Sequence, residues 1–464
     1  MRGIGLQMDR CRWLLAAVLV ALLAACGAEV PIPTPSLQPS PDPSVAPLPA
    51  FAADGERIAE HLAALQAIAD EHGGNRFAGT SGYEASVDWA VDELVELGFE
   101  VDTPEVEFTG FAELPGTELM VGASTFTGPD ELRGLIYSAS GEVTARVEIL
   151  DDSGCAAGDF EGVEPGTIVL TVESGCFRRQ QAINAVEAGA AALLVGYPGR
   201  GPGEIFRPTL IDPAGIEIPV VSVTDDAVRA LERAGDEPVR LNVETEREPA
   251  VLRNVIAQLG DGPSVVMVGA HLDSVLEGPG INDNGSGVAS VLEIARGVAE
   301  GGVPAGKAVR IGLWGGEELG LVGSRAYVEG LTDELVAYIN LDMTGSPNGA
   351  NLVYNELAVA EGSAEITQAF VEWFTDRGQQ VEPADLGGGS DHGSFNDAAI
   401  PTGGLFAGAT ETGGAAAPTA SGAGGEPADA CYHLACDDID NVDVERAALF
   451  ADATLAVALG LISD

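Results

Sequence analysis

Basic side chains are almost missing from this sequence. Of its 464 residues, 22 are Lys or Arg and 72 are Asp or Glu, which gives a formal net charge of −50 at pH 7. The only lysine is Lys307. Because nucleic acids and anionic membrane surfaces are polyanions, we expect neither to be a partner that binds through charge. The excess of carboxylates instead predicts an acidic, well-solvated surface.

The N-terminal apolar stretch is too short to span a bilayer comfortably. It reads WLLAAVLVALLA, follows Arg10 and Arg12, and is not followed by a stop-transfer pattern. The next letters, LAAC, resemble a bacterial lipobox that ends at Cys26. Residues 1–26 are therefore predicted to be a lipoprotein signal peptide with Cys26 lipidated; an ordinary secretory signal is the alternative. Either way we expect an exported protein, on the outer face of a bacterial cell membrane or secreted.

Cysteines are also few. After Cys11 and Cys26, both in the N-terminal segment, four of the six remain, at positions 155, 176, 431 and 436. An even number in an exported protein predicts disulfides, and the spacing favours Cys155–Cys176 and Cys431–Cys436. None of them has histidine partners at zinc-finger spacing.

Changes in composition predict five segments. After the signal peptide, the proline-rich residues 27–50 form an extended tether. Residues 51–111 begin the main domain with helical patterns up to residue 98, and 112–245 form a small β-rich domain in which one segment, RRQQAINAVEAGA, is helical. Residues 246–464 alternate strands with helices near 285–300, 317–330, 361–378 and 442–461. This alternation predicts an α/β domain whose mixed, mainly parallel central sheet is flanked by helices.

Histidines and acids gather at the predicted carboxyl ends of these strands, where ligands bind in open α/β sheets. They are His271 and Asp273 after SVVMVGA, Asp283 in the glycine-rich GINDNGSG, Glu317 and Glu318 after AVRIGLWGG, and Asp342 after LVAYINL. His433 follows later in CYHLAC. Taken singly, each residue could be a cap or a solvated surface group. Together they converge on one edge of one sheet.

Imidazole and carboxylate are the ligands of zinc and similar divalent metals. Carboxylates crowded at one edge would repel one another unless cations neutralised them. Two metals about 3.5–4 Å apart, bridged by a carboxylate and a water, would do so and would activate water for attack on a carbonyl. A glutamate beside the metals could then take the water's proton.

The motifs HLDSVLEGPGINDNGSGVA, WGGEELGLVGS, NLDM and SDHGSF resemble those of the co-catalytic di-zinc aminopeptidases (clan MH), of the bacterial secreted leucyl-aminopeptidase type. The stretches GGNRFAGTSGYEASVDW, IPTGGLFAGA and CYHLACDDIDNVD are similar to that family too. The likeness covers about residues 55–110 and 246–464. The stretches GCAAGDF, GTIVLTVESGCF and IPVVSV resemble a protease-associated (PA) domain, so the resemblance implies a zinc exopeptidase fold with an inserted PA domain.

The resemblance also implies the metal ligands. His271 and Asp342 would bind one zinc ion, Glu318 and His433 would bind the other, and Asp283 would bridge both. The chain would therefore carry two Zn²⁺. Calcium is possible, but the sequence does not decide it.

Further roles follow from the same resemblance. Glu317 would be the general base, and Tyr432 would donate a hydrogen bond to the oxyanion. Asp273 would orient the ring of His271. Asn284 would follow Asp283 on a peptide bond that is often cis in the family. The implied reaction removes N-terminal residues, expected to be bulky and apolar, from peptides or proteins, by a monomer that meets the membrane only through its lipid anchor.

The sequence departs from the family at Gly389, because some secreted members carry a substrate-positioning arginine directly before SDH. The adjacent Asp391 and His392 are interpreted as structural residues. Three alternatives remain open: a carboxypeptidase-like or dipeptidase relative, a single-zinc glutaminyl-peptide cyclase, and an inactive surface binding module. The first needs a cationic pocket, the second a single metal, and the third the loss of ligands or base.

Overall fold

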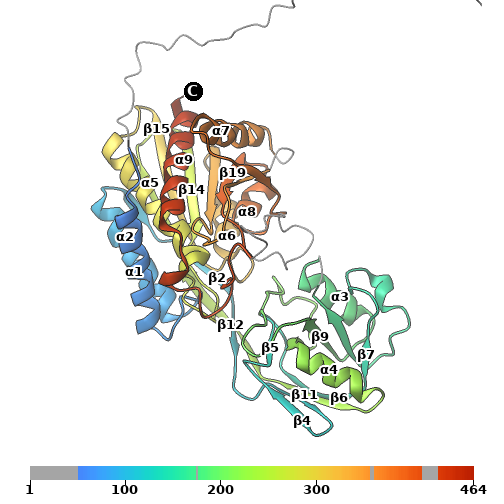
Figure 1. The fold of residues 1–464 in the computed structure, drawn as a ribbon. Coiled ribbons are helices and arrows are strands. Elements are labelled where there is room, and N and C mark those ends of the chain that lie inside the picture. The colour runs from blue at the N-terminus through green and yellow to red at the C-terminus, as the bar shows by residue number, and fades with distance from the viewer. Residues whose placement is uncertain (1–50, 174–175, 356–359, 410–426, 464) are drawn as a thin grey trace, which may run out of the picture. The chain divides into compact units, whose positions relative to one another are not determined.

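The computed structural model describes residues 51–463 except 174–175, 356–359 and 410–426. These described residues belong to one compact unit. The predicted signal peptide and the tether, with Cys11 and Cys26, lie outside the described residues. Figure 1 labels the elements used below.

Two helices open the described chain, as their apolar spacing predicts. Helix α1 (Gly55–Glu71) begins after Asp54, whose side chain accepts a hydrogen bond from the Glu56 amide, and α2 (Ser81–Glu96) begins after Thr80, whose hydroxyl accepts from the Tyr83 amide. Such side-chain acceptors satisfy amides that a helix start leaves unpaired. The caps fix where each helix begins.

The central sheet has eight strands, and its order is β1 (Glu100–Asp102), β13 (Val255–Leu259), β15 (Lys307–Trp314), β14 (Ser264–His271), β16 (Leu335–Asp342), β19 (Thr402–Phe406), β17 (Leu352–Tyr354) and β18 (Glu382–Ala384). Strands β15, β14, β16 and β19 are mutually parallel, whereas β1, β13 and β17 pair antiparallel with their neighbours toward the middle. The carboxyl ends of the four parallel strands therefore share one edge.

Strand β14 is apolar on both faces because both are covered. Val266 and Val268 belong to the larger core, whereas Val265 and Met267 belong to a separate core that includes Trp314. Alternate residues of a strand point to opposite faces, so a continuous apolar run fits a strand buried on both sides.

Helices cover the two faces of the sheet unequally. The larger core holds α1, α2, α5 (Gly287–Gly301), α7 (Ser363–Asp376) and α9 (Val444–Ser463), whose contacts with one another and with the sheet are extensive. The opposite face carries α6 (Val322–Gly330) and the short α8 (His392–Asp397). By length and composition α9 could cross a membrane, yet its Phe450, Ala451 and Ala458 are fully buried in the core.

One predicted helix starts later than expected. The pattern favours a helix over 317–330, but α6 begins at Val322. Gly316, Gly320 and Leu321 have φ of 70°, 110° and 62°, and such left-handed conformations cannot continue a right-handed helix. Glu317 and Glu318 therefore lie in a turn before α6 and are not part of the helix.

A two-stranded ribbon joins the main domain to the inserted one. It pairs β2 (Glu105–Glu113) with β12 (Thr245–Arg253). The inserted domain has a five-stranded sheet, β5 (Leu132–Gly134), β10 (Val220–Thr224), β9 (Ala192–Tyr197), β8 (Ile168–Val172) and β7 (Val147–Ile149). Its second sheet is β4 (Ser124–Thr127), β3 (Glu118–Val121), β11 (Val239–Val243) and β6 (Gly141–Ala145).

Among its described residues, the inserted domain has two α-helices rather than the single predicted one. The predicted segment forms α3 (Arg178–Glu187), and α4 (Asp225–Ala234) was not anticipated. In α4, Asp225 and Asp226 lie in the first turn, where carboxylates suit the helix dipole, and both pair with Arg229.

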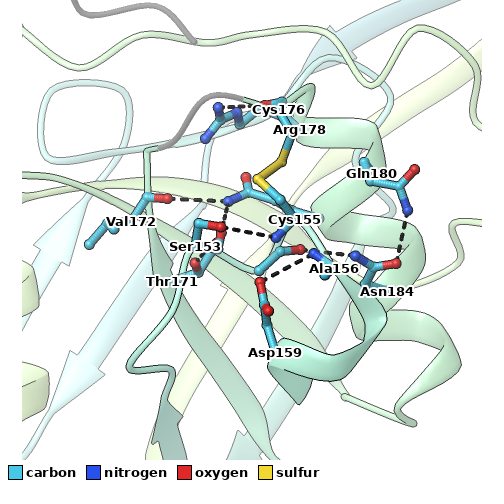
Figure 2. The surroundings of a disulfide bond; sticks show 12 residues. Ser153, Cys155, Ala156, Asp159, Thr171, Val172, Cys176, Arg178, Gln180 and Asn184 are labelled. Carbon is cyan, nitrogen blue, oxygen red and sulfur yellow. Dashed lines mark hydrogen bonds between the residues drawn. A yellow bond between two sulfur atoms is a disulfide. The ribbon is translucent and has the colours of Figure 1, made fainter. Parts of the chain in front are cut away.

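A disulfide between Cys155 and Cys176 joins the loop before β8 to the segment that leads into α3 (Figure 2). The Asn184 side chain of α3 donates to the Gly154 carbonyl beside it, at 3.0 Å. A second disulfide joins Cys431 and Cys436. These are the pairs that the spacing favoured.

Candidate metal centre

The carboxyl ends of three parallel strands place the predicted site. His271 is the last residue of β14, and Asp342 is the last residue of its neighbour β16. Glu317 and Glu318 follow β15, which pairs with β14 on its other side. The sheet order therefore brings these side chains together although they are up to 71 residues apart in the sequence.

The glycine-rich loop lets Asp283 reach the same edge. A Cβ on Gly287 would lie 2.1 Å from Oδ1 of Asn284 and 2.6 Å from the Leu341 carbonyl oxygen, so only glycine permits this loop to approach β16 so closely. The Asn284 side chain also donates to the Leu341 carbonyl at 2.9 Å. The Asp283–Asn284 peptide bond is cis.

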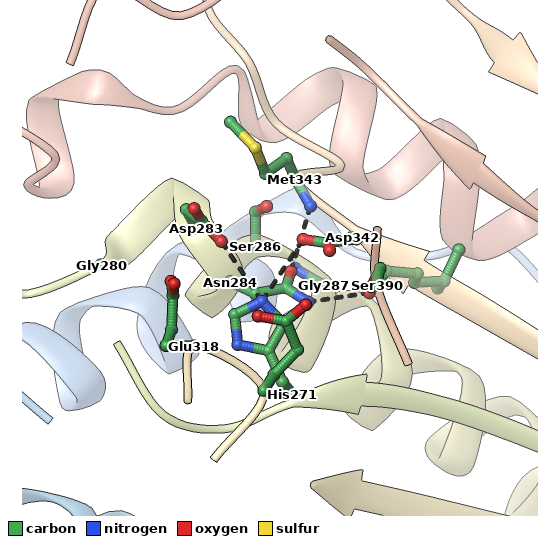
Figure 3. A network of polar contacts seen from close by, with 12 residues as sticks. His271, Gly280, Asp283, Asn284, Ser286, Gly287, Glu318, Asp342, Met343 and Ser390 are labelled. Carbon is green, nitrogen blue, oxygen red and sulfur yellow. Dashed lines mark hydrogen bonds and ion pairs between the residues drawn. The ribbon is translucent and has the colours of Figure 1, made fainter. Parts of the chain in front are cut away.

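The distances between the histidine nitrogens and the carboxylate oxygens match those expected between ligand atoms around two metal ions. His271 Nε2 lies 3.2 Å from Asp283 Oδ1 and 3.5 Å from Asp342 Oδ1. His433 Nε2 lies 3.2 Å from Asp283 Oδ2 and 3.3 Å from Glu318 Oε2. Two ligands of a tetrahedral zinc ion, each at about 2.0–2.1 Å, would be separated by about 3.3 Å. Figure 3 shows the carboxylates of Asp283, Glu318 and Asp342 around the His271 ring.

Asp283 faces each histidine with a different oxygen, which is the arrangement of a bridging carboxylate. Two overlapping sets of donors meet there: His271 with Asp283 and Asp342, and His433 with Asp283 and Glu318, each set lying within 4.8 Å. The buried Oδ1 of Asp342 has no hydrogen-bond donor among the described residues. Donor type, spacing and this free acceptor fit divalent zinc.

The electrostatics of the site favour positive charge. Burial alone would lower the pKa of His271, but nearby carboxylates, Asp342 and Glu317 foremost, raise it well above its ordinary value. The pKa of His433 rises in the same way, against the effect of burial, through Glu318 and Asp283. Protons or metal cations therefore compete for the same place.

Glu317 lies beside these ligand atoms but belongs to neither of the two sets. One of its oxygens lies within 4.8 Å of donor atoms of His271 and Glu318. Desolvation by the surrounding protein raises the pKa of Glu317 well above its ordinary value; His271 opposes this, and the carboxylates of Glu318 and Asp391 add to it. A carboxyl group with a raised pKa is suited to accepting and returning a proton near neutral pH.

Asp273 lies close to its predicted place, but its contacts differ. His271 Nδ1 lies 3.1 Å from the backbone carbonyl oxygen of Asp273 and 3.7 Å from the carboxylate oxygen Oδ1. The Asp273 carboxylate instead accepts from the amides of Glu317 and Glu318, at 3.2 and 3.4 Å. Asp273 thus holds the His271 ring through its backbone and the two glutamates through its side chain.

Tyr432 and His433 stand in a turn closed by the Cys431–Cys436 disulfide. Their rings are stacked with centroids 3.8 Å apart. Phe206 of the inserted domain meets both rings edge-on, with centroids 6.1 Å from Tyr432 and 6.4 Å from His433. The sequence did not point to Phe206, because no pattern around it differs from an ordinary loop.

Buried polar residues that the motifs did not single out support the loop before Asp283. Arg76 is fully buried and donates to the carbonyl oxygens of Pro279 and Gly280 at 3.0 and 2.8 Å, and to that of Leu272. Burial lowers the pKa of Arg76 to about 10. Its position in GGNRFAG, a stretch that carries the family resemblance, was the available signal.

Asp391 and His392, which were interpreted as structural residues, are fully buried. The His392 ring packs at 4.7 Å from that of Tyr354. Burial raises the pKa of Asp391 to about 7, while His271 opposes the shift.

Two known sequence families match the chain. Residues 254–458 match Peptidase family M28, and residues 139–231 match the PA domain. An "Aminopeptidase" of Pseudomonas aeruginosa is 37% identical over 426 residues, which cover 85% of this chain and 78% of the relative. The "Probable lipoprotein aminopeptidase LpqL" of Mycobacterium tuberculosis is 38% identical over 432 residues, covering 86% of this chain and 83% of the relative.

Solved structures share the fold. The aminopeptidase from Aneurinibacillus sp. strain AM-1 superposes with a TM-score of 0.68 at 23% identity, covering 88% of this chain and 93% of that one. BSAP, a zinc aminopeptidase from Bacillus subtilis, gives 0.68 at 24% identity over 87% and 94% of the two chains. The predicted fold class, a mixed α/β sheet flanked by helices with an inserted PA domain, is confirmed.

Proposed function

This chain belongs to peptidase family M28, as the resemblance in its sequence indicated, and on that premise we propose that it is a zinc-dependent aminopeptidase with two Zn²⁺ per chain. One observation carries the proposal: Asp283 faces His271 with one oxygen and His433 with the other, and Asp342 and Glu318 complete the two donor sets. Zinc bound there would lower the pKa of water and polarise a carbonyl group.

The chain's own residues would supply the remaining chemistry. Glu317 would accept the proton of the attacking water and pass it to the leaving amine. The hydroxyl of Tyr432 would donate to the developing oxyanion. Carboxylates around the ligands would receive the substrate's free α-amino group, which is cationic. This explains why an acidic rim suits N-terminal substrates.

We propose that the preferred N-terminal side chains are bulky and apolar. The ring of Phe206 beside Tyr432 and His433 supports this preference, because it borders the ligands with an apolar wall. The alternative carboxypeptidase activity needs an unpaired cation for the substrate carboxylate. Arg207 and Arg133 instead pair with Glu113 and Glu277. The guanidinium of Arg200 lies over the Phe206 ring, 4.5 Å from its centroid.

Hydrolysis of aminoacyl p-nitroanilides tests this function. The purified chain would be given free and N-acetylated substrates with several side chains, before and after a chelator, and again after zinc is returned. We expect cleavage of the free substrates only, lost with the chelator and restored by zinc. No cleavage of any free substrate by the zinc-loaded protein would refute the proposal.

We further propose that the protein is exported and anchored through Cys26. This localisation is supported by the lipobox LAAC, by the two disulfides and by the similarity to LpqL, a probable lipoprotein aminopeptidase. Radiolabelled palmitate should label the wild-type chain in a bacterial host and fail to label Cys26→Ser. Label retained by the variant would exclude this anchor. The monomeric state stays a prediction, which sedimentation of the purified protein would test.

A further inference from the structure

Asp437 accepts hydrogen bonds from three consecutive backbone amides of the loop that carries Asp283. Its carbonyl oxygen accepts from the Ile281 amide at 3.0 Å. Its carboxylate accepts from the Asn282 amide at 2.8 Å through Oδ1 and from the Asp283 amide at 2.9 Å through Oδ2. One residue therefore fixes the backbone up to and including the residue whose carboxylate faces both histidines.

Asp437 also ends the turn that holds His433. It directly follows Cys436, and its amide donates to the Leu434 carbonyl at 3.1 Å. The two loops that it joins are 154 residues apart in the sequence. Because the Asp283 loop and the His433 turn meet at this one side chain, its position sets the distance between two of the proposed ligands.

Two buried residues brace this contact. The side chain of Asn282 donates to Asp429 Oδ2 at 2.6 Å and to Ser346 Oγ at 3.1 Å, and its Oδ1 accepts from the Gly345 amide at 3.2 Å. Asp429 in turn accepts from the amide of Cys431 at 2.7 Å. The brace thus includes the segment after Asp342, so that three ligand-bearing segments meet here.

Burial makes the contact rigid and specific. Asp437 is 2% exposed, and Asp429 and Asn282 are fully buried. The Asp437 carboxylate accepts hydrogen bonds from two backbone amides and from the Asn441 side chain, the last at 3.1 Å. A carboxylate can accept at both oxygens, whereas an asparagine in the same place would turn an N–H donor toward one of the two amides.

We propose that Asp437 is a positioning residue of the metal centre, which holds the carboxylate of Asp283 at bridging distance from His433. The inference rests on the proposed zinc centre. Groups that hold ligands in place tune the affinity for the metal, and their loss costs about 10- to 100-fold in affinity or activity. Asp437 would act on the metal only through the ligands, without touching substrate.

The test compares Asp437→Asn with Asp440→Asn in the full-length chain. Both variants replace a carboxyl group with an amide, at positions three residues apart in the sequence. Asp440 is exposed, and its side chain is outside the brace. Two readouts are independent of activity: the rate of zinc release to a chromophoric chelator, and the rise in Tm when zinc is added to the metal-free protein. Bound zinc stabilises the folded state by an amount that grows with the logarithm of its affinity, so the rise reports on the site itself.

We expect Asp437→Asn to release zinc about 10- to 100-fold faster than wild type and to gain less Tm from zinc, while Asp440→Asn matches wild type. Release and Tm gain equal to wild type in Asp437→Asn would overturn the inference and leave the proposed function intact. A wild-type chain that binds no zinc would overturn both. An equal loss in Asp440→Asn would assign the effect to charge alone and overturn the positioning role.

A milder variant guards against misfolding. The Asn441 side chain bridges Asp437 and Asp429, with distances of 3.0 to 3.1 Å, and is itself only partly buried. Asn441→Ala keeps both carboxylates and should release zinc faster than wild type by a smaller factor, with the metal-free Tm nearly unchanged. Wild-type release from this variant would count against the brace even if Asp437→Asn does not fold.

Discussion

The largest sheet of each domain contains a run of parallel strands, but the two runs differ in what their strands carry at the carboxyl end. In the inserted domain, β8, β9 and β10 end at Val172, Tyr197 and Thr224. In the main domain, β14 and β16 end at His271 and Asp342. The topology alone therefore does not make a site. The main-domain sheet differs in placing histidines together with carboxylates at the edge where parallel strands end.

The pairing of charges differs in the same way. Carboxylates at the surface of the inserted domain meet arginines, as Glu118 and Glu142 do with Arg240. At the edge of the main sheet, Asp283 and Asp342 meet imidazoles instead. Uncompensated negative charge in a buried place is costly unless a cation neutralises it. The contrast predicts a cation site at the edge of the main sheet, whereas these carboxylates of the inserted domain are already paired with an arginine.

The largest effect is expected at Glu317. Because it would accept the proton of the attacking water, Glu317→Gln should lower kcat by about 10²- to 10⁴-fold with zinc content unchanged. The matched control is Glu173→Gln, which follows β8 of the inserted domain and whose pKa burial also raises. We expect wild-type kcat for the control. Steady-state kinetics and metal analysis decide, and a Glu317→Gln kcat within tenfold of wild type would contradict the assigned base.

A smaller loss should follow at Tyr432. Removing one donor to an oxyanion typically lowers kcat by about 10²- to 10³-fold, so Tyr432→Phe should lose kcat while KM changes little. Tyr197→Phe in the inserted domain, at a buried tyrosine close to Phe206, serves as the control. Equal effects of the two substitutions would show that Tyr432 contributes packing and not a hydrogen bond.

Zinc affinity should depend on pH in one direction. Neighbouring carboxylates raise the pKa of His271 and His433 in the metal-free protein, so both rings hold protons that zinc must displace. The apparent affinity should rise with pH until these rings lose their protons, by about tenfold per pH unit for each proton displaced. Competition with a chelator across pH measures this. An affinity that stays flat between about pH 6 and pH 8 would exclude imidazole ligands with raised pKa values.

The smallest effect is expected at Phe206, a residue of the inserted domain that contacts the site of the main domain. Phe206→Ala removes an aromatic contact worth about 0.5–1.5 kcal/mol, so kcat/KM for bulky apolar substrates should fall by about 2- to 12-fold. Phe126→Ala, in the separate core of the inserted domain, should lower stability and leave kcat/KM unchanged. Should both variants keep wild-type kcat/KM, the inserted domain would be a scaffold only.

The sequence predicted the candidate ligands at the strand ends, but it did not predict the residues that hold the ligand-bearing loops in place. His271, Glu318 and Asp342 follow apolar strands, and the shared edge of parallel strands predicts that they meet. Asp437 and Arg76 could not be predicted so, because their partners lie 154 to 204 residues away and no local period marks them. Family motifs pointed to their neighbourhoods but not to their bonds.

Local conformation explains the other differences. A helical pattern around Glu317 gave way to a turn because left-handed residues interrupt it. Helix α4 escaped notice because its ten residues lie between β-rich runs and bury only a few small and apolar side chains. Short elements depend on tertiary packing more than on their own propensity, so their sequences carry weaker signals.

Zinc content measured by equilibrium dialysis, in the wild-type chain and in Asp283→Ala, tests the central claim most directly. Two ions should bind to each wild-type chain, and the variant should retain fewer than one at the same free zinc concentration, because both donor sets lose their shared carboxylate. A wild-type chain that binds a single ion, or an Asp283→Ala chain that keeps both ions, would contradict the two-ion centre.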